Sequence, residues 1–109
     1  MIQETIAIVN ELGLHARAAA KFVNMASNFT SQVKLSRADK PEEEVDGKSI
    51  LGVLLLAAAL GSSIIIRVKG ADEDSAMSHL KNLVADGFGE MDEKREPVPL
   101  DSDADTNSR

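Results

Sequence analysis

The pattern of apolar and polar residues along the chain predicts four β-strands. Residues 5–9 are almost all β-branched, and the nearby isoleucines Ile2, Ile6 and Ile8 lie on one face of an extended chain. Residues 32–37 alternate between apolar and polar positions, which is typical of a half-buried strand. A short strand follows at residues 43–46, after a polar loop, and the most apolar strand covers residues 63–69.

Helical spacing of apolar residues predicts three helices between these strands. The first covers residues 16–26, and the second covers residues 50–60, after Ser49 at the N-cap position and before Gly61. The third begins with the acidic residues 72–74, which the helix dipole favours, and ends near Gly87. The residues expected to face the core are Ala19, Phe22, Val23 and Ala26 in the first helix, Val53, Leu56, Ala57 and Leu60 in the second, and Ala76, Leu80, Leu83 and Val84 in the third.

The resulting order is β-α-β-β-α-β-α, which predicts an α+β fold. We expect a two-layer open-faced sandwich, with a four-stranded antiparallel sheet and three helices on one face. Residues 1–91 form this domain. Residues 92–109 lose all periodicity and contain six acidic and three basic residues, so they carry a charge of −3 and are expected to form a flexible acidic tail.

Composition excludes several functions. The chain has 109 residues and a net charge of −6, which disfavours binding to nucleic acid. Its longest apolar run covers residues 50–60 and is shorter than the roughly 20 residues that cross a bilayer, so we expect no membrane insertion. No signal peptide is visible, and a cytoplasmic protein is expected. The absence of cysteine excludes disulfides, thiolate chemistry and cysteine-based zinc sites.

One histidine lies where its chemistry can be used. A loop at residues 10–13 places His15 at the start of the first helix, where backbone N–H groups and the helix dipole form an anion site. This placement keeps the imidazole neutral and nucleophilic and favours an attached phosphoryl group. Arg17 and Lys21 add positive charge. The alternative is that His15 is only a polar N-cap, and His79, which lacks such neighbours, is interpreted as a surface histidine.

A second feature begins at Ser49. A phosphate on this N-cap would add about two negative charges to the surface without disrupting the helix. The helix that follows has more apolar residues than one face can bury, since Ile50, Leu51, Leu54 and Leu55 cannot all reach the core. They predict an exposed partner-binding patch, the alternative being an unusually buried helix.

Two motifs in this order of elements resemble the HPr family, the histidine phosphocarriers of the bacterial phosphoenolpyruvate-dependent phosphotransferase system. They are GLHARAAA at residues 13–20 and KSILG at residues 48–52. The resemblance implies that His15 accepts a phosphoryl group on Nδ1, that Arg17 stabilises it, and that Ser49 is the site of an ATP-dependent HPr kinase/phosphorylase in some bacteria. The partner-binding surface for enzyme I and the IIA components is expected to contain Ala20, Lys21, Lys48, Ile50, Leu51, Leu54 and Leu55.

This resemblance predicts a monomeric phosphoryl carrier of sugar transport rather than an autonomous enzyme, with no metal and no organic cofactor. Three departures from the family pattern are Ala18, where proline is common, a longer loop at residues 39–44, and the extra acidic tail after about Glu90. One alternative is a carrier of the nitrogen-linked regulatory branch (NPr-like). Another is a ferredoxin-like domain that binds a metabolite. A P-loop kinase is disfavoured, because Glu42 stands where the first glycine of that motif belongs.

Overall fold

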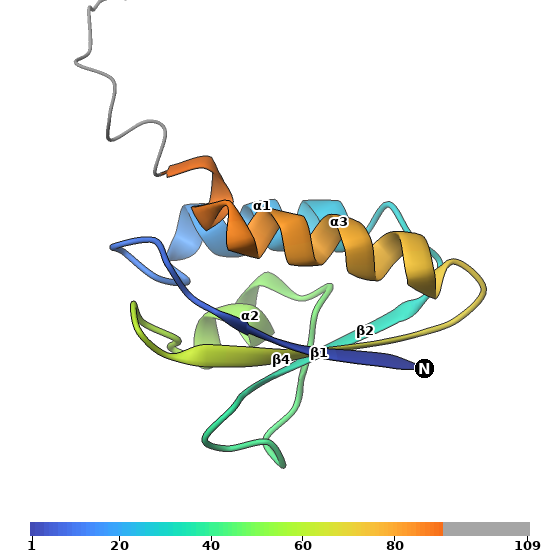
Figure 1. Ribbon diagram of the computed structural model, residues 1–109, viewed down its shortest axis with the longest axis horizontal. Helices are drawn as coiled ribbons and strands as arrows, with labels where there is room; N and C mark the ends of the chain where they lie inside the picture. The colour runs from blue at the N-terminus through green and yellow to red at the C-terminus, as the bar shows by residue number, and fades with distance from the viewer. Residues whose placement is uncertain (91–109) are drawn as a thin grey trace, which may run out of the picture.

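The computed structural model describes residues 1–90, which fold into one sheet, three α-helices and a short helical turn (Figure 1). The elements in chain order are β1 (Ile2–Ala7), α1 (Ala16–Ala26), β2 (Gln32–Arg37), β3 (Val45–Asp46), α2 (Ile50–Leu55), β4 (Ser63–Lys69), α3 (Glu73–Ala85) and the turn η1 (Gly87–Gly89). The predicted α+β class and element order are confirmed. The acidic tail predicted at residues 92–109 lies outside the described residues.

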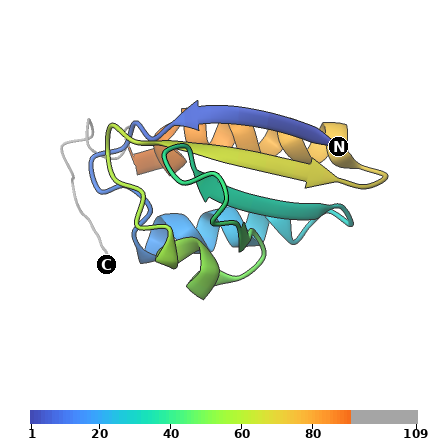
Figure 2. The same cartoon turned by 90° about the horizontal axis from the view of Figure 1, so that it is seen from below.

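The sheet has the strand order β1-β4-β2-β3, and every neighbouring pair is antiparallel. Helices α1 and α3 lie side by side over one face of this sheet, and α2 packs against α1 near β3 (Figures 1 and 2). The core between these layers is aliphatic, and Phe22 and Phe88 are its largest fully buried side chains. All four positions of α1 that were predicted to face the core are buried.

The first strand is shifted relative to its prediction. It covers Ile2–Ala7 instead of residues 5–9, because it pairs with β4 from Ile2 opposite Val68 to Ala7 opposite Ser63. The pairing partner therefore decides which part of the β-branched segment becomes a strand. The predicted face is correct, since Ile2 and Ile6 pack against the core and Ile8 is buried.

The second helix is shorter than predicted. It ends at Leu55 instead of Leu60, because Ala57 takes a left-handed conformation with φ 52° and turns the chain away from the helix axis. As a result, Ala58 is buried, whereas Ala57 and Leu60 are exposed and were wrongly predicted to face the core. The turned segment also meets the loop before α1, where the Leu14 N–H donates to the Ala58 carbonyl at 2.9 Å.

Asp72 at the start of α3 joins two parts of the chain. Its carboxylate accepts hydrogen bonds from the backbone N–H groups of Thr30 and Ser31, both at 2.9 Å, and from the Ser31 hydroxyl. These hydrogen bonds lower the pKa of Asp72 to about 2. Asp72 therefore ties the start of α3 to the loop between α1 and β2, rather than capping its own helix with its side chain. None of the helices formed by residues 1–90 is both long enough and apolar enough to cross a membrane.

Candidate functional site

His15 is the N-cap residue of α1. Its ring nitrogen Nδ1 accepts a hydrogen bond from the Arg17 backbone N–H at 3.2 Å, and its carbonyl accepts one from the Ala19 N–H at 2.8 Å. His15 therefore caps α1 with its side chain. The side chain is 27% exposed, so the ring stays accessible from solvent. The cap uses the lone pair of Nδ1, so this nitrogen is unprotonated and is oriented toward the N-terminus of α1.

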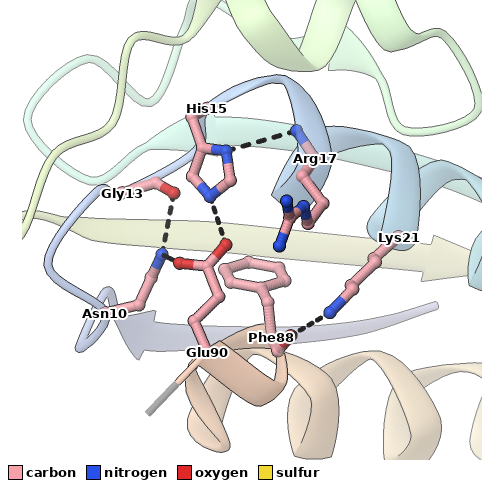
Figure 3. Close-up of polar contacts among 7 residues, drawn as sticks. All are labelled: Asn10, Gly13, His15, Arg17, Lys21, Phe88 and Glu90. Carbon is pink, nitrogen blue, oxygen red and sulfur yellow. Dashed lines mark hydrogen bonds and ion pairs between the residues drawn. The ribbon is translucent and has the colours of Figure 1, made fainter. Parts of the chain in front are cut away.

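The hydrogen bond accepted by Nδ1 identifies the tautomer of the ring. An Nδ1 atom that accepts a hydrogen bond carries a lone pair, so the proton of the neutral ring is on Nε2. Nε2 in turn contacts the carboxylate oxygen Oε2 of Glu90 (Figure 3). The imidazole thus lies between a backbone donor on one side and a carboxylate on the other. This arrangement presents a nucleophilic Nδ1 at the start of a helix, where an anion is favoured.

Glu90 is itself held in place. Its side chain is only 9% exposed, and its second oxygen, Oε1, accepts a hydrogen bond from Asn10 Nδ2 at 2.9 Å. The same amide nitrogen donates to the Gly13 carbonyl, also at 2.9 Å. Burial raises the pKa of Glu90, but the hydrogen bonds from Asn10 and His15, together with the electrostatic attraction of the His15 ring and of Lys21, bring this pKa below its usual range. A charged carboxylate therefore faces His15.

The segment that delivers Glu90 has an unusual backbone. Gly87, Phe88 and Gly89 all have positive φ angles, of 65°, 58° and 78°. Phe88 is 1% exposed and fixes the turn in the core, and its carbonyl accepts a hydrogen bond from Lys21 Nζ at 2.7 Å. Neither Asn10 nor Glu90 is among the site residues predicted from the sequence. The available signal was the Gly-Phe-Gly-Glu segment directly after the last predicted helix.

The predicted cations divide into two groups. Arg17 and Lys21 come from the first turns of α1, and their side chains extend along the side of the helix that faces Phe88 (Figure 3). Lys48, in contrast, donates from Nζ to the Phe29 carbonyl at 2.8 Å, beyond the other end of α1. Of the three predicted cations, only Arg17 and Lys21 therefore contribute positive charge beside His15.

Ser49 caps α2 as predicted, with its hydroxyl accepting from the Gly52 N–H at 3.1 Å. Helix α2 runs antiparallel to α1, so Ser49 lies beside the end of α1 that is remote from His15 (Figure 2). The eleven residues of α1 span about 16 Å. Ser49 and His15 thus cap two neighbouring helices, but they do not contact each other.

The predicted exposure of apolar residues on α2 is largely confirmed. Leu51 and Leu55 are 67% and 71% exposed, and Ile50 is also exposed, so the alternative of a buried helix is wrong. Leu54 differs, because it packs partly against the core, and Ala20 on α1 is half-buried. His79 is an exposed residue of α3 that bonds to the Ser75 carbonyl and contacts the Phe29 ring, which confirms its interpretation as a surface histidine.

An accessible histidine with an Nδ1 lone pair, at a helix N-terminus of an open-faced α+β sandwich, is the arrangement of a histidine phosphocarrier. Comparison with known proteins gives the same class. Residues 2–86 match the family model described as PTS HPr component phosphorylation site. The chain therefore belongs to the HPr family of the phosphotransferase system, and this membership removes the alternative of a ferredoxin-like metabolite-binding domain.

Relatives and solved structures agree with this membership. The phosphocarrier protein HPr of Cupriavidus necator is 50% identical over 90 residues, which cover 83% of this chain and 98% of the relative. HPr of Pseudomonas aeruginosa is 47% identical over 85 residues, which cover 78% of this chain and 92% of the relative. The crystal structure of HPr-C-His from Thermoanaerobacter tengcongensis matches with a TM-score of 0.75 and 39% identity, covering 82% of this chain and 97% of that one.

Proposed function

We propose that this protein accepts a phosphoryl group from phosphorylated enzyme I on Nδ1 of His15 and passes it to a histidine of a IIA component. In the first step the N–P bond of the donor breaks and the Nδ1–P bond forms, and in the second step these roles are reversed. The observation that supports this function is the pair of contacts made by the His15 ring, from which the tautomer follows. Its Nδ1 lone pair points to the start of α1, and its proton is held on the opposite nitrogen.

The groups around His15 favour the phosphorylated state. When Nδ1 bonds to phosphorus it can no longer accept the Arg17 backbone N–H, so that N–H becomes available to a phosphoryl oxygen. The helix dipole and the charges of Arg17 and Lys21 act on the same dianionic group. Little covalent chemistry is needed from this chain, because positioning and charge stabilisation support the transfer.

Incubation with enzyme I and phosphoenolpyruvate tests this function directly. We expect wild type to gain one acid-labile phosphate by mass spectrometry and His15→Ala to gain none. His79→Ala is the matched control, since His79 is an exposed histidine on another helix. Equal phosphate uptake by His15→Ala and wild type would disprove the assignment.

We further propose that enzyme I and the IIA components bind the apolar patch of Ile50, Leu51 and Leu55, together with the neighbouring surface of α1. Burying such exposed leucines against a partner is favourable by about 25 cal/mol per Å² of apolar surface. Leu51→Asp is expected to raise the KM for this protein in the enzyme I reaction. Leu60→Asp is the control, because Leu60 is also exposed but lies outside α2. Equal effects of the two substitutions would argue against this docking surface.

The pathway served is proposed to be the sugar branch, because the similar relatives carry the name HPr. Phosphorylation rates with enzyme I of the sugar branch and with its nitrogen-branch counterpart separate the two alternatives. We expect the sugar-branch enzyme to be faster. A faster reaction with the nitrogen-branch enzyme would assign the protein to the regulatory role instead.

Ser49 is proposed as a regulatory phosphorylation site, acted on by an HPr kinase/phosphorylase. Because Ser49 does not contact His15, its phosphate would act on docking rather than on the ring. Ser49→Asp should slow phosphorylation by enzyme I, whereas Ser49→Asn, which also caps a helix but adds no charge, should not. An unchanged rate for Ser49→Asp at physiological salt would remove this proposal.

We propose that the protein acts as a cytoplasmic monomer. Strand β1, at the edge of the sheet, pairs with β4 of the same chain, so the fold is complete without a second copy. Light scattering coupled to gel filtration should give a mass close to 11.7 kDa. A mass of twice this value would contradict the monomer.

A further inference from the structure

We propose that Glu90 is a positioning residue for phosphoryl transfer, whose carboxylate keeps the ring proton on Nε2 of His15 while Nδ1 forms and breaks its bond to phosphorus. This inference deepens the proposed function and rests on it. Glu90 lies 75 residues from His15 in sequence and reaches the ring from the opposite end of the described chain.

Each oxygen of the Glu90 carboxylate has its own donor. Oε2 faces His15 Nε2, and Oε1 accepts from Asn10 Nδ2 at 2.9 Å. A buried carboxylate is costly unless it is hydrogen-bonded, so these two contacts compensate for the burial of Glu90. The Asn10 amide is turned toward this carboxylate although its own oxygen, Oδ1, is buried without a hydrogen-bond partner. The orientation of Asn10 is therefore explained by the acceptor that it serves.

The backbone before Glu90 supports a specific role for this residue. Three consecutive residues have positive φ angles, and one of them, Phe88, is not glycine. A left-handed conformation costs a non-glycine residue about 1–2 kcal/mol, and such strain concentrates at functional sites. The burial of Phe88 and the hydrogen bond from Lys21 to its carbonyl keep this turn in place. These contacts fix the turn, which therefore holds the Glu90 carboxylate against the His15 ring.

The carboxylate affects both directions of the transfer. Without an acceptor at Nε2, a fraction of the protein molecules would carry the His15 proton on Nδ1. In those molecules Nδ1 would have no lone pair with which to bind phosphorus. When Nδ1 shares its lone pair with phosphorus, the ring acquires positive charge, which the Glu90 carboxylate stabilises. When the N–P bond breaks toward the next acceptor, its electron pair returns to Nδ1 and the ring leaves as neutral imidazole. No proton has to move in either direction.

The negative charge of Glu90 does not oppose the incoming phosphoryl group directly. The carboxylate contacts Nε2, whereas the phosphoryl group is attached at Nδ1, so the imidazole ring separates the two anions (Figure 3). The cations Arg17 and Lys21, from α1, are the other charged groups that the close-up places around the ring. Phosphoryl group and carboxylate can therefore be accommodated on opposite edges of one histidine.

Two variants of Glu90 and one control test this role. Glu90→Ala removes the acceptor, and Glu90→Gln keeps an amide oxygen but removes the charge. Asp86→Asn is the matched control, because it removes one carboxylate from the same segment at a residue whose side chain makes no capping hydrogen bond. A 1H–15N HSQC spectrum of each variant confirms that the fold is kept.

The first measurement is the tautomer of His15, taken from the ring 15N shifts at alkaline pH and independent of any partner. We expect Nε2–H to dominate in wild type and in Asp86→Asn, and its share to fall in Glu90→Gln and further in Glu90→Ala. The second measurement is phosphorylation by enzyme I. There kcat is expected to fall about tenfold for Glu90→Ala, with KM little changed, the lower end of the loss seen when a carboxylate that orients a metal-binding histidine is removed.

The results separate the two proposals. If the tautomer and kcat of both Glu90 variants equal those of Asp86→Asn, Glu90 has no positioning role, and the phosphocarrier function is unaffected. If wild type takes up no phosphate while the tautomer of His15 changes in the Glu90 variants, the proposed function fails. Glu90 would then still determine which ring nitrogen carries the proton. A higher KM with unchanged kcat would place Glu90 in docking and overturn the positioning role.

Discussion

Gly13, two residues before His15, provides a sharp test of how the site is built. It has a φ of 65°, which glycine adopts readily and alanine does not. A Cβ atom added there would lie 2.5 Å from the Ala58 carbonyl oxygen and 2.9 Å from the Ala59 Cα, both backbone atoms. Gly61 has a similar positive φ of 91°, but a Cβ there would meet nothing within 4 Å. Gly13→Ala and Gly61→Ala therefore share the conformational cost and differ in the collision.

The expected loss of folding free energy follows from the conformational cost and from the collision of the added Cβ atom. The left-handed conformation costs alanine about 1–2 kcal/mol, and the lower entropy of the unfolded alanine chain returns about 0.4–1 kcal/mol of this. We therefore expect Gly61→Ala to lose about 1 kcal/mol. At position 13, displacement of packed backbone adds about 1–3 kcal/mol, and weakening of the hydrogen bond from Leu14 to Ala58 adds about 1 kcal/mol. The expected loss for Gly13→Ala is thus about 3–5 kcal/mol.

Urea denaturation followed by circular dichroism measures both values, with equal m-values showing that the variants unfold from similar states. The melting temperature of Gly13→Ala should fall clearly further than that of Gly61→Ala, since 1 kcal/mol corresponds to roughly 4–8 °C in a domain of this size. If the two free energies of unfolding agree within about 0.5 kcal/mol, the close approach of Gly13 to Ala58 does not constrain the fold. The explanation of this glycine would then be wrong.

Three further predictions concern other parts of the chain. Asp72→Asn should destabilise the protein at neutral pH. Because the folded pKa of about 2 lies below the usual value, the stabilisation by Asp72 is complete above about pH 4 and is lost as the pH falls through 2, so urea titrations of variant and wild type should converge there. Phe88→Ala should cost about 3–5 kcal/mol of stability in the same assay and should also shift the His15 ring resonances, since Phe88 anchors the turn that carries Glu90. Deletion of residues 92–109 should leave the melting temperature within about 2 °C of wild type, whereas a larger fall would show that this segment belongs to the folded domain.

Local patterns were sufficient for most of the fold and for part of the site. Helix α1 has the bounds that its apolar spacing predicts, because one buried face repeats over three turns. His15 and Ser49 cap their helices as predicted, since capping depends on residues within one turn. The exposed patch on α2 also followed from local pattern, because a single helix cannot bury all of its faces in one core.

Other features depended on contacts between distant segments. Nothing near residues 2–7 in sequence fixes the start of β1, whose bounds come from its register with β4. The end of α2 at Leu55 has a similar origin, since its apolar pattern continues to Leu60 and only the packing of the next turn against Gly13 interrupts the helix.

The site itself divides in the same way. The sequence by itself determined the histidine proposed as the nucleophile, its helix terminus and its neighbouring arginine, because these lie within three residues of one another. Only the tertiary structure decided the second partner of the ring. Glu90 reaches His15 because the core holds Phe88 and a left-handed turn redirects the chain, and periodicity contains no information about such a long-range contact.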